Sequence, residues 1–311
     1  MRSVFAQSPS WRHPVHIQMK ILTPKKIVGL HATEMPLGLT GQLYAMIDHG
    51  GMPGLVHQLD RTNTEWVSLF AGSRDEGALD VAPLLFLVDR EETFQGKALL
   101  SWICAHGAYS TSVILMESPL LLHPLAFRLA KRLDATLADE TEIFLRFFDT
   151  RIFEVLLPIL SLRQKKAFLD VAYAWWYVNR RGEIVEVEAR YADTESELLP
   201  LALSDAQETT LLEACELDQV AALLVIFVPN EYNAIEPFAR HEFISRNALI
   251  AQDFGIKSVQ ELAFFCSLAL LYGEDFIALD GWTAALDEVS KGKSTLGEVA
   301  ARLEEVNELK A

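Results

Sequence analysis

Apolar positions in the first two thirds of the chain fall into short runs separated by polar turns that contain Gly or Pro. Four of these runs are nearly continuous and end at turn residues, which is typical of buried strands. They cover residues 43–48, 66–70, 81–88 and 109–115. Helical spacing appears over 93–105 and from about 118 to 133. The sequence therefore predicts an N-terminal α/β (α+β) lobe with a mixed sheet flanked by helices.

The strand-like pattern stops beyond the polar segment 194–200. Ser204 and Asp205 are candidate caps of a helix that reaches about Phe227. Further helices are expected near 236–252, 258–272, 281–290 and 295–309. The predicted organisation is a loosely ordered leader over 1–40, an α/β domain over 41–195 and an all-α lobe over 196–311.

The segment Ile143–Pro158 changes its period in the middle. Its first part, up to Phe148, is aromatic and β-branched like a buried strand, and helical spacing follows Asp149. An aspartate at this junction can accept hydrogen bonds from the first N–H groups of the helix, and it can pair with Arg146 or Arg151. We interpret Arg146, Asp149 and Arg151 as an ion cluster that fixes a strand-to-helix corner, in preference to an active site.

An aromatic strand follows the central segment. Residues 169–178 and 183–191 alternate like the two arms of a hairpin around the turn Asn179–Gly182. Alternation places Tyr173, Trp175 and Tyr177 on one face and Trp176 on the other. Core packing on both faces is the favoured explanation, and the alternative is an aromatic platform for a protein partner.

Charge is distributed unevenly along the chain. The net charge is −16, and residues 192–311 hold 7 Lys and Arg against 22 Asp and Glu, so this part carries −15. Such a surface should repel nucleic acid and favour a basic or neutral protein partner, unless it serves solubility alone. The three cysteines show no zinc or disulfide spacing, and no apolar run is long enough to cross a membrane. We expect a soluble, cytoplasmic protein with no membrane insertion.

Catalytic motifs are absent from the sequence. It has no G-x-S-x-G, H-E-x-x-H or P-loop pattern, and His13 and His16 lack a nearby third ligand for a metal. Residues 49–54 predict a plain Gly-rich turn rather than a phosphate cradle, and Asp48 is expected to anchor that turn. We therefore expect no cofactor, no metal and no enzymatic activity.

A series of weak motifs occurs in a fixed order between residues 42 and 178. They are Tyr-Ala-x-x-Asp at 44–48, Leu-x-x-Gly at 69–72, Ala-Pro at 82–83 and Arg-x-x-Asp-x-Arg at 146–151. In this order the chain resembles the effector chaperone or adaptor family of the bacterial type VI secretion system, a family of domains of unknown function encoded between the VgrG spike and a toxin effector. The chain departs from the family at Phe148 and Thr150, where Tyr and Pro are frequent.

The resemblance implies a non-enzymatic adaptor that binds a cognate toxin effector in the cytoplasm and helps load it onto the VgrG spike. It implies that Asp48 and the 146–151 motif hold the scaffold, while aromatic residues such as those at 173–177 and the acidic surface bind partners. The alternative is a hydrolase-like enzyme that uses Asp149, Asp48 and His49 in a cleft between the lobes.

Overall fold

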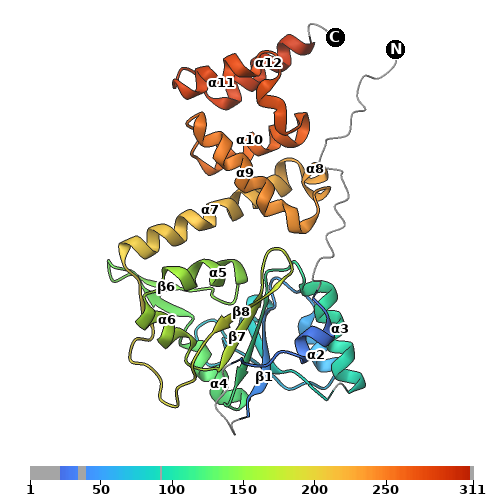
Figure 1. Cartoon of the computed structure of the whole chain (residues 1–311), viewed down its shortest axis with the longest axis vertical. Coiled ribbons are helices and arrows are strands. Elements are labelled where there is room, and N and C mark those ends of the chain that lie inside the picture. The colour runs from blue at the N-terminus through green and yellow to red at the C-terminus, as the bar shows by residue number, and fades with distance from the viewer. Residues whose placement is uncertain (1–21, 34–39, 92, 309–311) are drawn as a thin grey trace. The chain divides into compact units, whose positions relative to one another are not determined.

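The computed structural model describes residues 22–33, 40–91 and 93–308, and Figure 1 labels their helices and strands. The described residues form two compact units, one ending at Cys215 and the other beginning at Glu216. The first unit contains sheets and helices, and the second contains helices. The predicted fold class is therefore confirmed.

The main sheet of the first unit has six strands in the order β2-β3-β1-β4-β7-β8, and every neighbouring pair is antiparallel. The strands are β1 (Gln42–Asp48), β2 (Trp66–Ser68), β3 (Pro83–Leu87), β4 (Val113–Ser118), β7 (Ala174–Val178) and β8 (Ile184–Glu188). In the centre of the sheet, Ala45 lies opposite both Phe86 and Leu115. The predicted hairpin is formed by β7 and β8.

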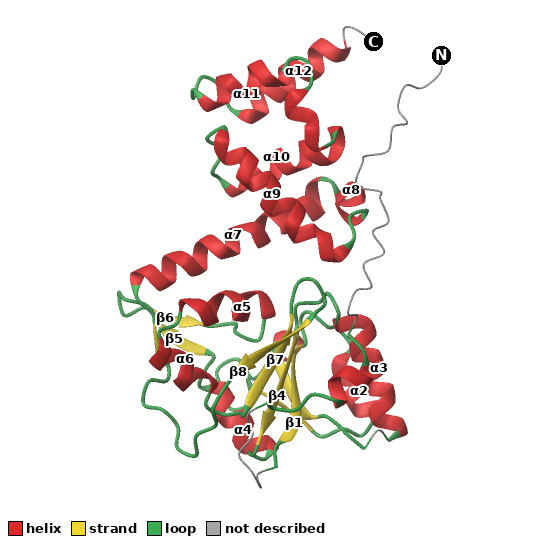
Figure 2. Cartoon of the chain, viewed as in Figure 1, coloured by secondary structure: helices red, strands yellow, loops and turns green. Residues whose placement is uncertain are grey.

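Helices cover both faces of this sheet, as Figure 2 shows. They are α1 (Pro24–Val28), α2 (Leu55–Arg61), α3 (Phe94–Gly107), α4 (Leu122–Ala130), α5 (Thr150–Ile159) and α6 (Leu162–Leu169), with a short 3₁₀ turn, η2 (Leu79–Val81). On one face, Trp175 stacks on Phe153 of α5 with a centroid distance of 5.7 Å. On the other face, α3 approaches β4 so closely that a Cβ atom on Gly107 would lie 2.8 Å from Val113 Cγ2.

The mixed sheet is a separate, smaller one, with the order β6-β5-β9. It consists of β5 (Asp134–Thr136), β6 (Glu142–Phe144) and β9 (Leu201–Ala202), and β9 runs parallel to β5. Because β9 completes this sheet, the chain after residue 195 still belongs to the first unit. The division between the units therefore falls inside α7 (Asp205–Phe227) rather than in the 194–200 segment.

Part of the predicted leader belongs to the hydrophobic core of the first unit. Leu22 and Ile27 are buried, and Thr23 caps α1 by accepting a hydrogen bond from the Lys26 N–H. The prediction of a loose leader is therefore wrong for residues 22–33. Residues 1–21, which include His13 and His16, and residues 34–39 lie outside the described residues.

The fourth strand and the helix after it begin later than the sequence pattern indicates. The strand begins at Val113 rather than at residue 109, and Ser118 lies inside it. The Ser118 hydroxyl donates a hydrogen bond to the Val171 carbonyl, so it joins two distant parts of the chain. Residues 119–121 are not helical, and α4 begins at Leu122.

The second unit is built around α10, which is buried along most of its length from Leu262 to Leu270. Its elements after α7 are α8 (Pro229–Asn233), η3 (Pro237–Ala239), α9 (Arg240–Asp253), α10 (Val259–Tyr272), η4 (Glu274–Ala278), α11 (Trp282–Ser290) and α12 (Leu296–Glu308). Phe276 packs between Phe265 and Trp282, with a ring-centroid distance of 5.0 Å to each. The predicted helices are present near their expected positions because their apolar spacing and caps are local signals.

No helix among the described residues is both long enough and apolar enough to span a membrane. Cys104 and Cys266 are buried, and burial raises the pKa of each thiol to about 12. Cys215 is half-buried, and none of the three cysteines, all of which lie within the described residues, forms a disulfide.

Candidate functional site

The charged residues of the central segment meet at the N-terminus of α5. Asp149 is the N-cap, and its Oδ1 accepts a hydrogen bond from the Arg151 N–H at 3.0 Å. The Arg151 guanidinium donates to both carboxylate oxygens, with Nη2 2.6 Å from Oδ2. Arg146 instead pairs with Asp48, across a distance of 3.0 Å between Nη2 and Oδ2. The Arg146–Asp48 pair thus connects the end of β1 to the segment that leads into α5, while the Arg151–Asp149 pair is local to the start of the helix.

The buried strand expected over 143–148 is wrong beyond Phe144, where β6 ends. Phe147 and Phe148 are consecutive and both fully buried. Successive side chains of a β-strand point to opposite faces of the sheet, so a strand with one solvent-exposed face could not bury both. Phe147 packs edge-to-face on Phe168 at 5.2 Å, while Phe148 packs edge-to-face on Phe70 at 6.4 Å. A turn closed by the Asp149 N–H and the Arg146 carbonyl, 3.0 Å apart, then leads into the helix.

Asp48 anchors the Gly-rich turn after β1, as its position predicts. Its Oδ1 accepts a hydrogen bond from the Gly50 N–H at 2.9 Å. Burial raises the pKa of Asp48, and the nearby Asp149 charge adds to this effect, while Arg146 and the Gly50 N–H oppose it. A Cβ atom on Gly51 would lie only 1.9 Å from Ser112 Oγ, so the turn needs glycine for close packing. His49 Nδ1 lies 2.9 Å from the Leu79 carbonyl oxygen.

A second buried ion cluster joins α4 to the end of α6. Asp170 Oδ1 accepts hydrogen bonds from Arg128 Nη2 at 2.9 Å and from Arg132 Nη2 at 2.7 Å. Arg132 also donates to the carbonyls of Phe168 and Ala167, and its side chain is completely buried. Burial lowers the pKa of Arg132 to about 10 despite the neighbouring carboxylate. The sequence pattern could not pair Arg132 with Asp170, because the two residues are 38 positions apart in the chain.

A third charged group, Glu117, lies on β4 and is buried. Its Oε2 accepts a hydrogen bond from the Ala32 N–H at 2.6 Å, and its Oε1 pairs with Arg90 Nη2 at 3.0 Å. Glu117 therefore holds the segment before β1 against the main sheet. Sequence reasoning missed this role of Glu117. The signal that could have revealed it is a single carboxylate directly after the apolar run Val113–Met116.

The four aromatic residues for which a partner platform was the alternative explanation lie in the core. Trp175 has no exposed surface, Trp176 is 2% exposed, and Tyr173 and Tyr177 are each 7% exposed. The Trp175 indole N–H donates a hydrogen bond to the Leu169 carbonyl at 3.1 Å, which satisfies its polar group. The alternative of an aromatic platform is therefore wrong as a surface assignment, and these side chains pack in the core as the favoured explanation expects. The reason is that β7 is an inner strand of a sheet whose two faces are covered by helices.

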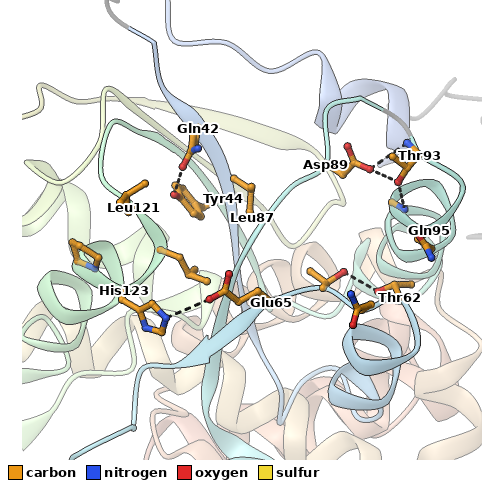
Figure 3. A pocket seen from close by; sticks show the side chains of 15 residues that line it. Gln42, Tyr44, Thr62, Glu65, Leu87, Asp89, Thr93, Gln95, Leu121 and His123 are labelled. Carbon is orange, nitrogen blue, oxygen red and sulfur yellow. Dashed lines mark hydrogen bonds and ion pairs between the residues drawn. The ribbon is translucent and has the colours of Figure 1, made fainter.

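A cavity of about 660 Å³ opens beside the starts of α3 and α4, and Figure 3 shows its lining side chains. Asp89 accepts hydrogen bonds from the N–H and hydroxyl of Thr93, and the hydroxyl contact lowers the pKa of Asp89. Glu65 Oε1 lies 3.4 Å from His123 Nε2. The lining contains no Lys or Arg, and its acidic side chains are Glu65 and Asp89, so the cavity is a mixed polar and apolar hollow with acidic groups.

Within the described part of the chain, no group of three or more His, Cys, Asp or Glu residues is placed to hold a metal ion. Comparison with curated proteins and with solved structures finds no match for the chain. Residues 43–167, which run from β1 into α6 and include the Asp149 corner, match the family model described as Domain of unknown function (DUF4123).

Proposed function

We propose that this protein is an adaptor of a bacterial type VI secretion system, which binds a toxin effector in the cytoplasm and helps load it onto the VgrG spike. The domain match over 43–167 carries the proposal. The ordered motifs by which the sequence resembles the effector adaptors, from residues 44–48 to 146–151, all lie inside the matched stretch.

The roles of the motif residues support binding rather than catalysis. Asp149 caps α5, and Asp48 closes the turn after β1. Both carboxylates are buried and each is paired with an arginine. Groups engaged in this way maintain the fold, and we propose that the protein catalyses no reaction.

Exposed apolar side chains of the first unit are better candidates for partner contact than the buried aromatics. Five of them expose more than half of their surface, and they are Phe94, Leu121, Phe127, Leu162 and Leu212. Large apolar groups on a surface are frequent in protein interfaces when they lie among polar residues. We propose that effector and spike contacts use such positions.

The acidic C-terminal region supports a partner with a basic surface. Residues 192–311 carry −15, and opposite charges on a partner would accelerate association at low ionic strength. Association rates measured by stopped-flow at increasing salt should fall, whereas salt-independent rates would argue against this part of the proposal.

Co-expression with the toxin encoded beside this gene tests the main proposal. An affinity-tagged chain should co-purify the toxin, the VgrG protein or both, and an identically tagged unrelated protein serves as the control. Recovery of neither protein would contradict the adaptor function.

A hydrolase remains the second candidate, because burial and the neighbouring Asp149 raise the pKa of Asp48. Asp149→Asn keeps a side-chain oxygen for the helix cap and removes the charge. We expect this variant to fold and to bind the effector as the parent does. A measurable turnover in the parent that Asp149→Asn abolishes without unfolding would favour the enzyme instead.

A further inference from the structure

A second cavity of the first unit, of about 340 Å³, lies between one face of α6 and the end of β8. It is lined by Leu162, Lys165, Lys166, Leu169, Glu188, Ala189 and Arg190. The α6 residues are spaced three and four apart, so they share one side of the helix. We call this set of residues the α6 pocket.

The charge of the α6 pocket is opposite to that of the whole protein. Lys165, Lys166 and Arg190 line it against a single acid, Glu188, while the chain carries −16. Lys165 and Lys166 have no ion-pair partner within the described residues, and α6 contains no acidic residue. The pocket is therefore a local cationic site on an anionic protein.

The same pocket has an apolar component held on a rigid element. Leu162 is the first residue of α6 and is 87% exposed. A capping box between Ser161 and Gln164 fixes the start of the helix, and Gln164 also donates to the Ala202 carbonyl. Leu169 and Ala189 line the cavity beside the two lysines. An exposed leucine on a fixed helix start can contact an apolar side chain of a ligand without ordering a loop.

We propose that the α6 pocket binds an acidic peptide segment of the carried protein, with an apolar side chain packed against the exposed Leu162. This inference rests on the proposed adaptor function. The two lysines would pair with carboxylates, which carry the complementary charge, and Arg190 adds to the positive potential of the pocket. The cavity lies near the lower end of the roughly 300–1,000 Å³ range of ligand pockets, so it accommodates a few side chains of a segment rather than a folded surface.

Neutral substitutions in the full-length protein test this assignment. Lys165→Gln with Lys166→Gln removes two charges and keeps helix propensity nearly unchanged. The matched control is Lys25→Gln with Lys257→Gln, which removes two exposed lysines outside the pocket. Thermal scans should give both variants the melting temperature of the parent within a few degrees.

The first measurement is the affinity of each variant for the protein that co-purifies with the parent. The pocket variant should bind roughly 2- to 30-fold more weakly at low salt, because it loses two partly exposed ion pairs with the ligand. The control variant should bind as the parent does. Short overlapping peptides that cover the co-purified protein are then the probe for the segment. The peptides bound by the parent should be acidic and contain an apolar residue, and the pocket variant should lose them.

The outcomes separate the two proposals. If the parent co-purifies neither toxin nor VgrG, the adaptor function fails and the pocket assignment fails with it. If the parent binds its partner and the pocket variant binds equally well, or if the bound peptides are basic or neutral, only the assignment of the α6 pocket is wrong.

Discussion

Asp170 is the residue whose loss should damage the first unit most, because it is the counter-ion of two buried arginines. Its Oδ1 lies 2.7 Å from Arg132 Nη2 and 2.9 Å from Arg128 Nη2. The Arg132 side chain is completely buried, and its pKa is already lowered to about 10 by burial with the carboxylate in place. Replacing Asp170 would leave this guanidinium charged in a region that water does not reach.

The magnitude follows from the burial of the cluster. Removing one partner of a buried ion pair costs about 3–5 kcal/mol, because the remaining charge is uncompensated. Asp170→Asn retains a carbonyl oxygen that can accept one hydrogen bond, so we expect the lower end of that range. Asp170→Ala also loses this acceptor, so we expect the upper end. For a unit of this size each kcal/mol lowers the melting temperature by about 2–4 °C.

The matched control is the neighbouring pair between Lys131 and Glu195. The Lys131 side chain is 41% exposed and that of Glu195 is 24% exposed, so solvent screens this pair more than the Asp170 cluster, and Glu195→Gln should cost about 1 kcal/mol or less. Both substitutions replace one carboxylate by an amide and change the net charge equally. Because the Glu195 charge also acts on Arg132, the difference between them is a lower limit for the effect of burying the Asp170 carboxylate.

Hydrogen exchange measured by mass spectrometry is the appropriate assay, because the protein has two units and a single unfolding transition cannot be assumed. The amides of β4 and β7 report the opening of the first unit. In Asp170→Asn their protection should fall by the predicted free energy, while the amides of α10 in the second unit keep theirs. Equal losses in Asp170→Asn and Glu195→Gln would refute the reasoning, as would a loss below 1 kcal/mol in Asp170→Ala.

Three further predictions use other parts of the first unit. Asp149→Ala removes the cap of α5 and leaves Arg151 without its carboxylate, so it should destabilise by about 1–3 kcal/mol in urea titrations, and an unchanged midpoint would reject this. Trp175→Ala should cost about 3–5 kcal/mol because it opens a cavity against Phe153, and a variant that lost only partner binding would contradict the core assignment. Burial raises the pKa of Tyr44 from 10.0 to about 12, so the stability it contributes is complete below pH 10 and is lost as the pH rises towards 12. The ultraviolet difference titration between the parent and Tyr44→Phe should show a tyrosine that ionises with a midpoint near pH 12. A midpoint near pH 10 would contradict this prediction.

The sequence by itself determined the features that depend on neighbours along the chain. Helical spacing and caps located the helices of the second unit, and Asp149 was correctly expected to cap a helix, because a cap bonds to an N–H only two residues away. The hairpin of β7 and β8 followed from alternation around the turn at Asn179–Gly182, which is also a local signal.

Tertiary structure decided everything that joins distant segments. Arg146 could have paired with Asp149 on spacing alone, and only the fold brings it to Asp48, 98 residues earlier. Asp170 meets Arg132 in the same way, and β9 joins β5 to keep residues 201–202 in the first unit. The aromatic strand illustrates the same limit, since alternation gives the two faces of β7 but not what covers them. Burial depends on the helices that pack on each face, and their positions are set by the whole core rather than by the strand's own residues.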